Sequence, residues 1–325
     1  MKIHYIDSLI AEMLDCVDRH NLGGPAKYCR RPLGDINEYG VADAANILYT
    51  LGEFDKVQKD RDEWIKVLQS MQDKDTGMYS ESTHHTIHTT AHCTAALELF
   101  DAKPLYKCKY LEDCLTKEGM CDKLENGIRW ATDPWRDSHI GAGIFVCLLN
   151  TGMIDSEWKR NYFEWCYENT DPETGFIFFG NEKKADLYQY MASGFHYFFN
   201  HESEHMPMHY PEKVIDSCLY LMENTSDFKC CETCGFIEID VVYCLTRAMR
   251  QSPHRFYEAK SALDSFADKY LEMLYNTDYA NERHFNDLHC LFGAVCCIAE
   301  LQSALPGKII SKKPLRLVLD RRPFI

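Results

Sequence analysis

The sequence is poor in basic residues and carries none of the short motifs that identify several common catalytic folds. Its 325 residues include 35 lysines and arginines against 50 aspartates and glutamates, a net charge of −15. A nucleic-acid partner is not expected, because binding phosphates needs a basic face. There is no P-loop, no dinucleotide-binding glycine fingerprint and no serine nucleophile elbow, and Gly141 and Gly143 stand inside a predicted helix.

Long apolar runs are also missing. No run approaches 18 apolar residues, and segment 1–7 has no signal-peptide core, so neither a membrane partner nor secretion is predicted. The sixteen cysteines are scattered, with many inside apolar helical runs, as for Cys147, Cys244 and Cys297, where a free thiol behaves as a small hydrophobic group. We therefore expect free thiols and a soluble, cytoplasmic protein that acts on a small-molecule substrate, with its oligomeric state left open.

The dominant feature of the sequence is a helical repeat. Each copy has a polar residue, a mostly small residue four positions later, and an apolar helical run. The copies follow one another in steps of 49, 47, 51, 50 and 49 residues, with polar positions Asp43, His92, His139, Tyr190, Asp240 and His289. A helical repeat of this length indicates a stacked or closed array. Residues 1–307 are therefore predicted to form one all-α domain of six helical hairpins.

Within each repeat the pattern predicts an amphipathic outer helix, a turn-rich loop and a more apolar inner helix. We expect the inner helices to begin near residues 39, 88, 135, 187, 237 and 285. Residues 308–325 depart from the repeat, with six basic residues and one acid, Asp320. This basic C-terminal tail is predicted either to lie over the acidic body or to contact a subunit or ligand.

If the array closes into a ring, the aligned polar residues lie at one level around a central cavity. Five of them are predicted to be catalytic, because such side chains transfer protons: His92, His139, Tyr190, Asp240 and His289. Residues at or near the cavity mouth are predicted to bind substrate: Asp43, Tyr39, His88, Trp135, Arg136 and Asp186. The alternative is that the polar residues pair with one another and cap the inner helices, since buried polar groups need partners.

Two further clusters contain residue types that bind metals. His84, His88 and His92 have the spacing that places side chains on one face of a helix, although His84 also fits a loop. The segment Cys230-Cys231-Glu232-Thr233-Cys234 holds three thiols and a carboxylate, which suit either zinc or a structural role. No metal ligand and no cofactor are assigned, and zinc remains an open alternative.

Two loops resemble those of a known superfamily. Residues 72–79 read Gln-Asp-Lys-Asp-Thr-Gly-Met-Tyr, and residues 171–176 read Asp-Pro-Glu-Thr-Gly-Phe. These loops and the repeat resemble the α/α-toroid enzymes, above all the terpenoid cyclase and protein prenyltransferase superfamily. Polysaccharide lyases, uronyl hydrolases and sugar epimerases share such toroids. The resemblance implies an (α/α)6 toroid whose central cavity opens where the inner helices begin, and it leaves sugar and isoprenoid chemistry both open.

The functional residues of that superfamily match this sequence only in part. The Asp-x-Asp-Asp motif of class II cyclases is missing, and Val242 replaces the cysteine that accompanies Asp240 and His289 in the zinc site of prenyltransferases. Arg136 beside His139 suits uronate chemistry, because a guanidinium pairs with a carboxylate. We therefore expect a carbohydrate-active lyase, hydrolase or epimerase with His, Tyr and Asp acid–base groups. The alternatives are an isoprenoid-active cyclase or prenyltransferase-like protein and a non-catalytic ligand-binding toroid.

Overall fold

The computed structural model describes residues 2–279, 281–282, 285–321 and 324. Helices dominate these ranges, which confirms the prediction of an all-α chain. Two short strands, β1 (His4–Tyr5) and β2 (Ile309–Ile310), pair in parallel and join the beginning of the chain to the tail. Within the described ranges, no helix is both long and apolar enough to cross a membrane.

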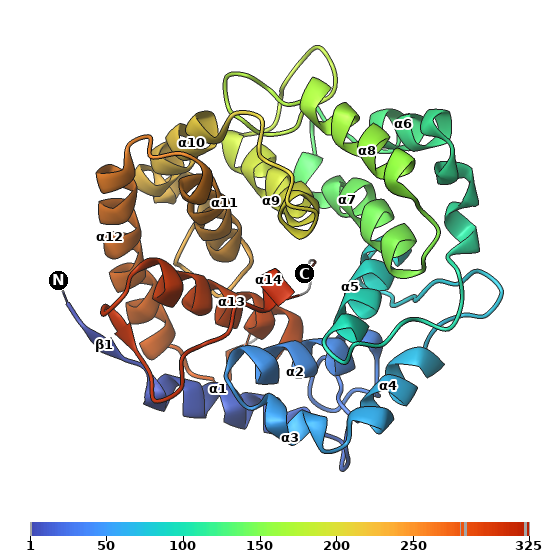
Figure 1. Ribbon diagram of the computed structural model, residues 1–325. Helices are drawn as coiled ribbons and strands as arrows, with labels where there is room; N and C mark the ends of the chain where they lie inside the picture. Colours follow the sequence, from blue (N-terminus) through green and yellow to red (C-terminus); the bar gives the residue numbers. More distant parts are fainter. Residues whose placement is uncertain (1, 280, 283–284, 322–323, 325) are drawn as a thin grey trace.

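Six helices contact one another in a closed cycle around the centre of the molecule (Figure 1). In order they are α2 (Glu38–Thr50), α5 (Thr86–Glu98), α7 (Pro134–Asn150), α9 (Leu187–Ser203), α11 (Ile237–Gln251) and α13 (Leu288–Ala304). The contact between α13 and α2 closes the cycle. Every one of these helices begins within three residues of its expected start.

The glycines in this cycle explain the small residues of the repeat. A Cβ atom at Gly143 would lie 2.8 Å from Ile87 Cγ2 of α5, and one at Gly194 would lie 2.6 Å from Phe176 Cδ1. Both distances are too short for carbon atoms, so a larger residue would push its neighbours apart. Close packing therefore keeps the position four residues after the polar residue small in the repeats of His139 and Tyr190.

The other α-helices, apart from α14, lie outside the cycle in Figure 1. They are α1 (Asp7–Arg19), α3 (Phe54–Gln58), α4 (Arg61–Ser70), α6 (Lys117–Asn126), α8 (Ser156–Glu168), α10 (Pro211–Glu223) and α12 (Phe256–Tyr275). Two 3₁₀ helices, η1 (Lys109–Leu115) and η2 (Thr225–Phe228), come before α6 and α11. Helix α8 is typical of this layer, because it buries Trp158 and Tyr162 and exposes Glu157.

The described part of the C-terminal tail reaches the middle of the cycle, where α14 lies (Figure 1). After β2 it forms α14 (Val318–Arg321), which contacts α2 and α9. Arg247, fully buried on α11, donates hydrogen bonds to Glu300 Oε1 at 2.6 Å and to Asp320 Oδ1 at 2.7 Å. This buried guanidinium therefore ties α14 to α11 and α13.

Basic residues of the tail also pair with acids of the body. Lys308 lies 2.8 Å from Asp264 Oδ2, and Lys313 lies 2.7 Å from Glu53 Oε1. Lys308 is buried, whereas Lys313 is exposed, so water screens the second pair more strongly. Together with Arg247, these pairs hold the tail against the end of the cycle at which the inner helices finish.

Candidate functional site

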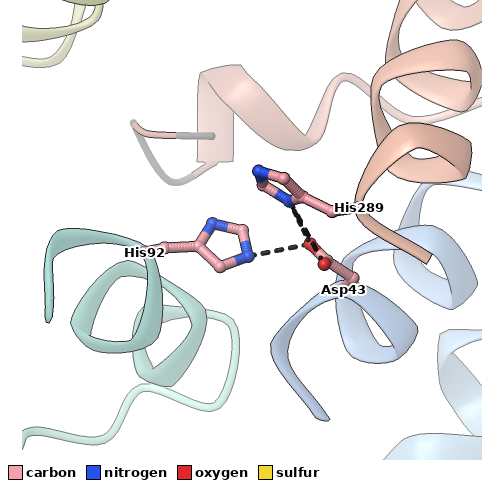
Figure 2. Close-up of side chains that lie close together, drawn as sticks. All are labelled: Asp43, His92 and His289. Atoms are coloured by element: carbon pink, nitrogen blue, oxygen red, sulfur yellow. Dashed lines mark hydrogen bonds and ion pairs between the residues drawn. The ribbon is translucent and has the colours of Figure 1, made fainter. Parts of the chain in front are cut away.

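The centre of the site is the buried carboxylate of Asp43 on α2. His92 Nε2 of α5 lies 2.8 Å from Asp43 Oδ1, and His289 Nδ1 of α13 lies 3.2 Å from both carboxylate oxygens. Figure 2 shows both imidazoles turned toward the carboxylate. Burial raises the pKa of Asp43, but the two histidines outweigh it and lower that pKa below its usual range. An ionised carboxylate only accepts hydrogen bonds, so both ring nitrogens donate.

The start of α13 is held in place by charges from the first loop. Arg30 Nε donates to Asp287 Oδ1 at 2.7 Å, and Arg31 Nη2 donates to Asp287 Oδ2 at 3.0 Å. The carboxylate of Asp287 also caps α13 by accepting from the backbone N–H of His289. Since α13 closes the cycle against α2, this cap sets the position of the His289 ring beside Asp43.

A stack of aromatic rings continues from the Asp43 cluster toward the mouth. The rings of His84, His88 and His92 follow one another with centroid separations of 4.8 and 6.3 Å and nearly parallel planes. The Tyr39 hydroxyl lies 2.5 Å from His88 Nδ1. Burial and the neighbouring His139 and His84 lower the pKa of His88 well below its ordinary value, while burial raises the pKa of Tyr39. The Tyr39 hydroxyl therefore donates a hydrogen bond to a neutral His88.

A small cavity of about 90 Å³ lies beside this stack. Its walls come from all the inner helices except α2, together with the loops before α5 and α11: His84, His88, Trp135, His139, Phe195, His196, Phe236, Asp240 and His289. The His139 ring lies 4.3 Å from that of His88 and 4.4 Å from that of His196. Burial and the nearby His84 lower the pKa of His139 to about 3, so its imidazole is neutral near neutral pH.

Asp240 on α11 is the one acid in this wall, and it is as buried as Asp43 but differs from it in hydrogen bonding and in the direction of its pKa shift. Neither of its carboxyl oxygens has a hydrogen-bond partner within the described ranges. Burial, together with the charge of Glu238, raises the pKa of Asp240 well above its ordinary value. A carboxyl group that stays protonated in a cavity can donate a proton, as a general acid does.

A wider cleft of about 700 Å³ lies outside the small cavity, and His84 and His139 line both. Arg136 is exposed in this cleft. Arg129 is held by two hydrogen bonds of 2.7 Å to the carboxylate of Asp137. The walls of the cleft are therefore mostly polar, with two exposed guanidinium groups, of which that of Arg129 is paired with Asp137.

A residue of the tail packs against two histidines of the small cavity's wall. The ring of Phe324 is buried and lies 5.2 Å from His88 and 6.2 Å from His196. The cavity thus adjoins the cleft through His84 and His139, and the tail contacts its wall through Phe324.

The structure brings most of the predicted site residues together. His92, His289 and Asp43 form the hydrogen-bonded cluster, and Tyr39 packs against it. Four other predicted residues line the small cavity: His88, Trp135, His139 and Asp240. Arg136 lies in the cleft beside His139.

Tyr190 and Asp186 do not lie with the other predicted site residues. Neither belongs to the Asp43 cluster, and neither lines the small cavity or the cleft. The Tyr190 hydroxyl donates to the carbonyl of Ala131 at 3.3 Å, and its ring packs edge-on against Phe178. Asp186 is exposed just before α9. On α9 it is His196 that lines the cavity. Six residues of α-helix turn by about 600°, so Tyr190 and His196 point roughly 120° apart.

Sequence reasoning missed Arg30, His196 and Phe324. Arg30 stands in a predicted loop, and only its neighbour Arg31 and the following proline mark the segment. His196 lies outside the aligned column, and a search for polar residues nearly two helical turns further along each inner helix could have found it. Phe324 carries no local signal, because its position depends on the path of the tail.

Among the residues that the structure describes, two groups of side chains have ligand atoms close enough together to hold a metal ion. They are Asp43, His92 and His289, and Cys230, Cys231 and Glu238, each with its ligand atoms within 4.8 Å of one another. In the second group the two sulfur atoms lie 3.8 Å apart, and Glu238 Oε1 accepts from the backbone N–H of Cys231.

Comparison with known proteins found no match: no family model matches the chain, and neither does a curated protein or a solved structure.

Proposed function

We propose that this chain is an (α/α)6 toroid of the kind found in terpenoid cyclases, polysaccharide lyases and uronyl hydrolases. The closed cycle of α2, α5, α7, α9, α11 and α13 supports this assignment, and so does the layer of helices around it. The cleft lies where inner helices begin, which is the open end that such an architecture implies. The proposal concerns the fold alone, because toroids of this kind serve unrelated reactions.

On this fold we propose an enzyme that moves protons in the small cavity. The observation that carries this function is that Asp240 and His139 line the same cavity. Burial keeps the first as a neutral acid and the second as a neutral base in one cavity. When the surroundings raise the pKa of one group and lower the pKa of another, the first can act as the acid and the second as the base. His139 would take a proton from carbon, and Asp240 would give one to a leaving oxygen or back to carbon.

The proposed substrate is a carbohydrate that carries a carboxylate, such as a uronate. The small cavity holds only the reacting part of a sugar, and the adjoining cleft has room for the remainder. Arg136 would pair with a carboxylate, and Trp135 would stack on a sugar ring. A bound anion would also raise the pKa of His139, because a nearby negative charge favours the protonated imidazole.

The lining of the cavity disfavours isoprenoid chemistry. A prenyl chain would need a deep apolar sleeve, whereas five histidines and an aspartate stand in the wall of a cavity of about 90 Å³. For the compartment we propose the cytoplasm, since all sixteen cysteines are free thiols.

The experiment is a screen of uronate-containing disaccharides and their neutral counterparts, followed by NMR in D₂O. We expect deuterium incorporation or elimination at the carbon beside the carboxylate for a uronate and none for the neutral sugars. His139→Gln should lower the rate by roughly 100- to 10,000-fold, as removal of an acid–base group does.

His201→Gln is the matched control, because His201 is also buried but packs on the other side of α9 against Phe163 and Tyr167. It should keep the wild-type rate. If wild-type protein turns over no uronate but converts a prenyl diphosphate, the isoprenoid alternative is correct. If it converts neither, the carbohydrate function and the isoprenoid function are both wrong.

A further inference from the structure

We propose that Asp43, His92 and His289 bind one divalent transition-metal ion, with zinc as the best match. This inference goes beyond the proton-transfer function and does not need the substrate to be a carbohydrate. It assigns a chemical role to the most deeply buried polar cluster in the site.

The distances between the three ligand atoms suit a tetrahedral ion. Asp43 Oδ1 lies 2.8 Å from His92 Nε2 and 3.2 Å from His289 Nδ1, and all three ligand atoms lie within 4.8 Å of one another. In a tetrahedral zinc site with bonds of about 2.0–2.1 Å, ligand atoms stand roughly 3.3 Å apart. Small side-chain shifts would therefore admit the ion. The proton on each coordinating nitrogen would move to the other nitrogen of its ring.

The donor set favours zinc over the hard cations. Magnesium and calcium take oxygen ligands, whereas imidazole nitrogen suits zinc, copper, iron and nickel. Two imidazoles and one carboxylate form a recognised catalytic zinc set, and they leave a fourth position for water or substrate. His289 lines the small cavity, so an ion that it holds would border the space where a substrate reacts. There it would polarise an oxygen atom of the substrate.

The fold positions these three side chains even without a bound ion. They come from three different inner helices, α2, α5 and α13, at the seam where the cycle closes (Figure 2). Arg30 and Arg31 fix the start of α13 through Asp287. The Tyr39 ring packs against both imidazoles, with centroid separations of 5.2 Å to His92 and 4.6 Å to His289. A preformed site loses little entropy when the ion binds.

The test is the metal content of the full chain, purified without a histidine tag from zinc-supplemented cells. Elemental analysis should find about one zinc ion per chain, as a single three-ligand site requires. The ion is then removed with a chelator, and Zn²⁺ is titrated back in competition with a chromophoric chelator. We expect His92→Gln and His289→Gln to weaken affinity by more than about 100-fold, since even changes outside the ligand set cost 10- to 100-fold.

Two control variants distinguish this site from the other places on the chain where zinc could bind. His201→Gln removes a buried histidine elsewhere and should leave zinc affinity unchanged. Cys230→Ser removes a ligand from the cysteine group and should also leave it unchanged. If Cys230→Ser abolishes binding and His92→Gln does not, the ion belongs to the cysteine group and the proposal is wrong. Absence of tight Zn²⁺ binding by wild-type protein would overturn it as well.

A third measurement covers the case in which the histidine variants fail to fold. X-ray absorption of zinc-loaded wild-type protein should show nitrogen and oxygen ligands, and sulfur ligands would contradict the site. The metal-site proposal and the acid–base proposal can also be refuted independently of each other. If His139→Gln has normal turnover while zinc binding depends on His92, the proposed acid–base function is wrong and the metal site stands.

Discussion

Helix α13 is flanked by two aspartates of the same repeat that lie in opposite environments. On one side, Asp43 of α2 receives His92 and His289 and is held ionised. On the other side, Asp240 of α11 has no hydrogen-bond partner in the described part of the chain and is held protonated. Both carboxyl groups are fully buried.

This difference shows that burial alone does not decide the charge of an acid. Desolvation raises the pKa of both carboxyl groups, and only the two imidazoles beside Asp43 reverse that effect. Asp43 therefore belongs to a paired cluster that stabilises the fold. Asp240 instead is an unpaired group that costs stability, which is the usual mark of a functional residue. The same substitution at the two positions should separate these roles.

The largest expected effect is on turnover, in Asp240→Asn. An amide cannot donate a proton as an acid does, so the rate should fall by roughly 100- to 10,000-fold. The melting temperature should stay the same or rise, because no existing hydrogen bond is lost. Turnover in the uronate assay and thermal unfolding give the two readouts. Loss of stability with full activity would assign Asp240 to the fold.

The pH dependence sharpens the same comparison. The raised pKa of Asp240 means that the folded protein keeps a proton which the unfolded chain releases near pH 4. Above that pH the unfolding free energy of wild-type protein should therefore fall with rising pH, relative to Asp240→Asn, by up to about 1.4 kcal/mol per pH unit. The difference should stop growing above the folded-state pKa. Denaturant unfolding of both proteins across pH 4–8 measures it.

Asp43→Asn should have its main effect on stability. Removing one partner of a buried ion pair typically costs about 3–5 kcal/mol, because the remaining groups stay buried without their counterpart. Unfolding by urea in the presence of a chelator would isolate this loss from any effect of bound metal. A loss below about 1 kcal/mol would mean that the carboxylate is not paired as the structure shows, and the contrast with Asp240 would disappear.

The smallest expected effect is that of Tyr190→Phe. This change removes one hydrogen bond to the Ala131 carbonyl, which contributes about 0.5–1.5 kcal/mol. Turnover should remain within a few fold of wild type, because the Tyr190 hydroxyl lies outside the cavity. A loss of activity as large as that of Asp240→Asn would restore Tyr190 to the site.

The sequence predicted where each polar residue lies along its helix better than it predicted toward which side the side chain points. The repeat spacing located the starts of α9 and α11 at residues 187 and 237, as the structure has them. It placed Tyr190 and Asp240 in equivalent positions, yet only Asp240 lines the cavity. A helix can rotate about its axis without changing its ends, and packing against its neighbours sets that rotation. His196 was missed for the same reason.

By itself the sequence determined an all-α chain, the period of its helices and a set of titratable residues on the inner ones, because hydrophobic periodicity and small residues are local signals. Only the tertiary structure decided that Asp43 meets His289 across 246 residues of chain. It also decided that Arg30 pairs with Asp287 at the start of α13 and that the ring of Phe324 packs against His88. These contacts form where the two ends of the chain close the cycle. No local pattern records them, because each depends on the summed geometry of every helix between.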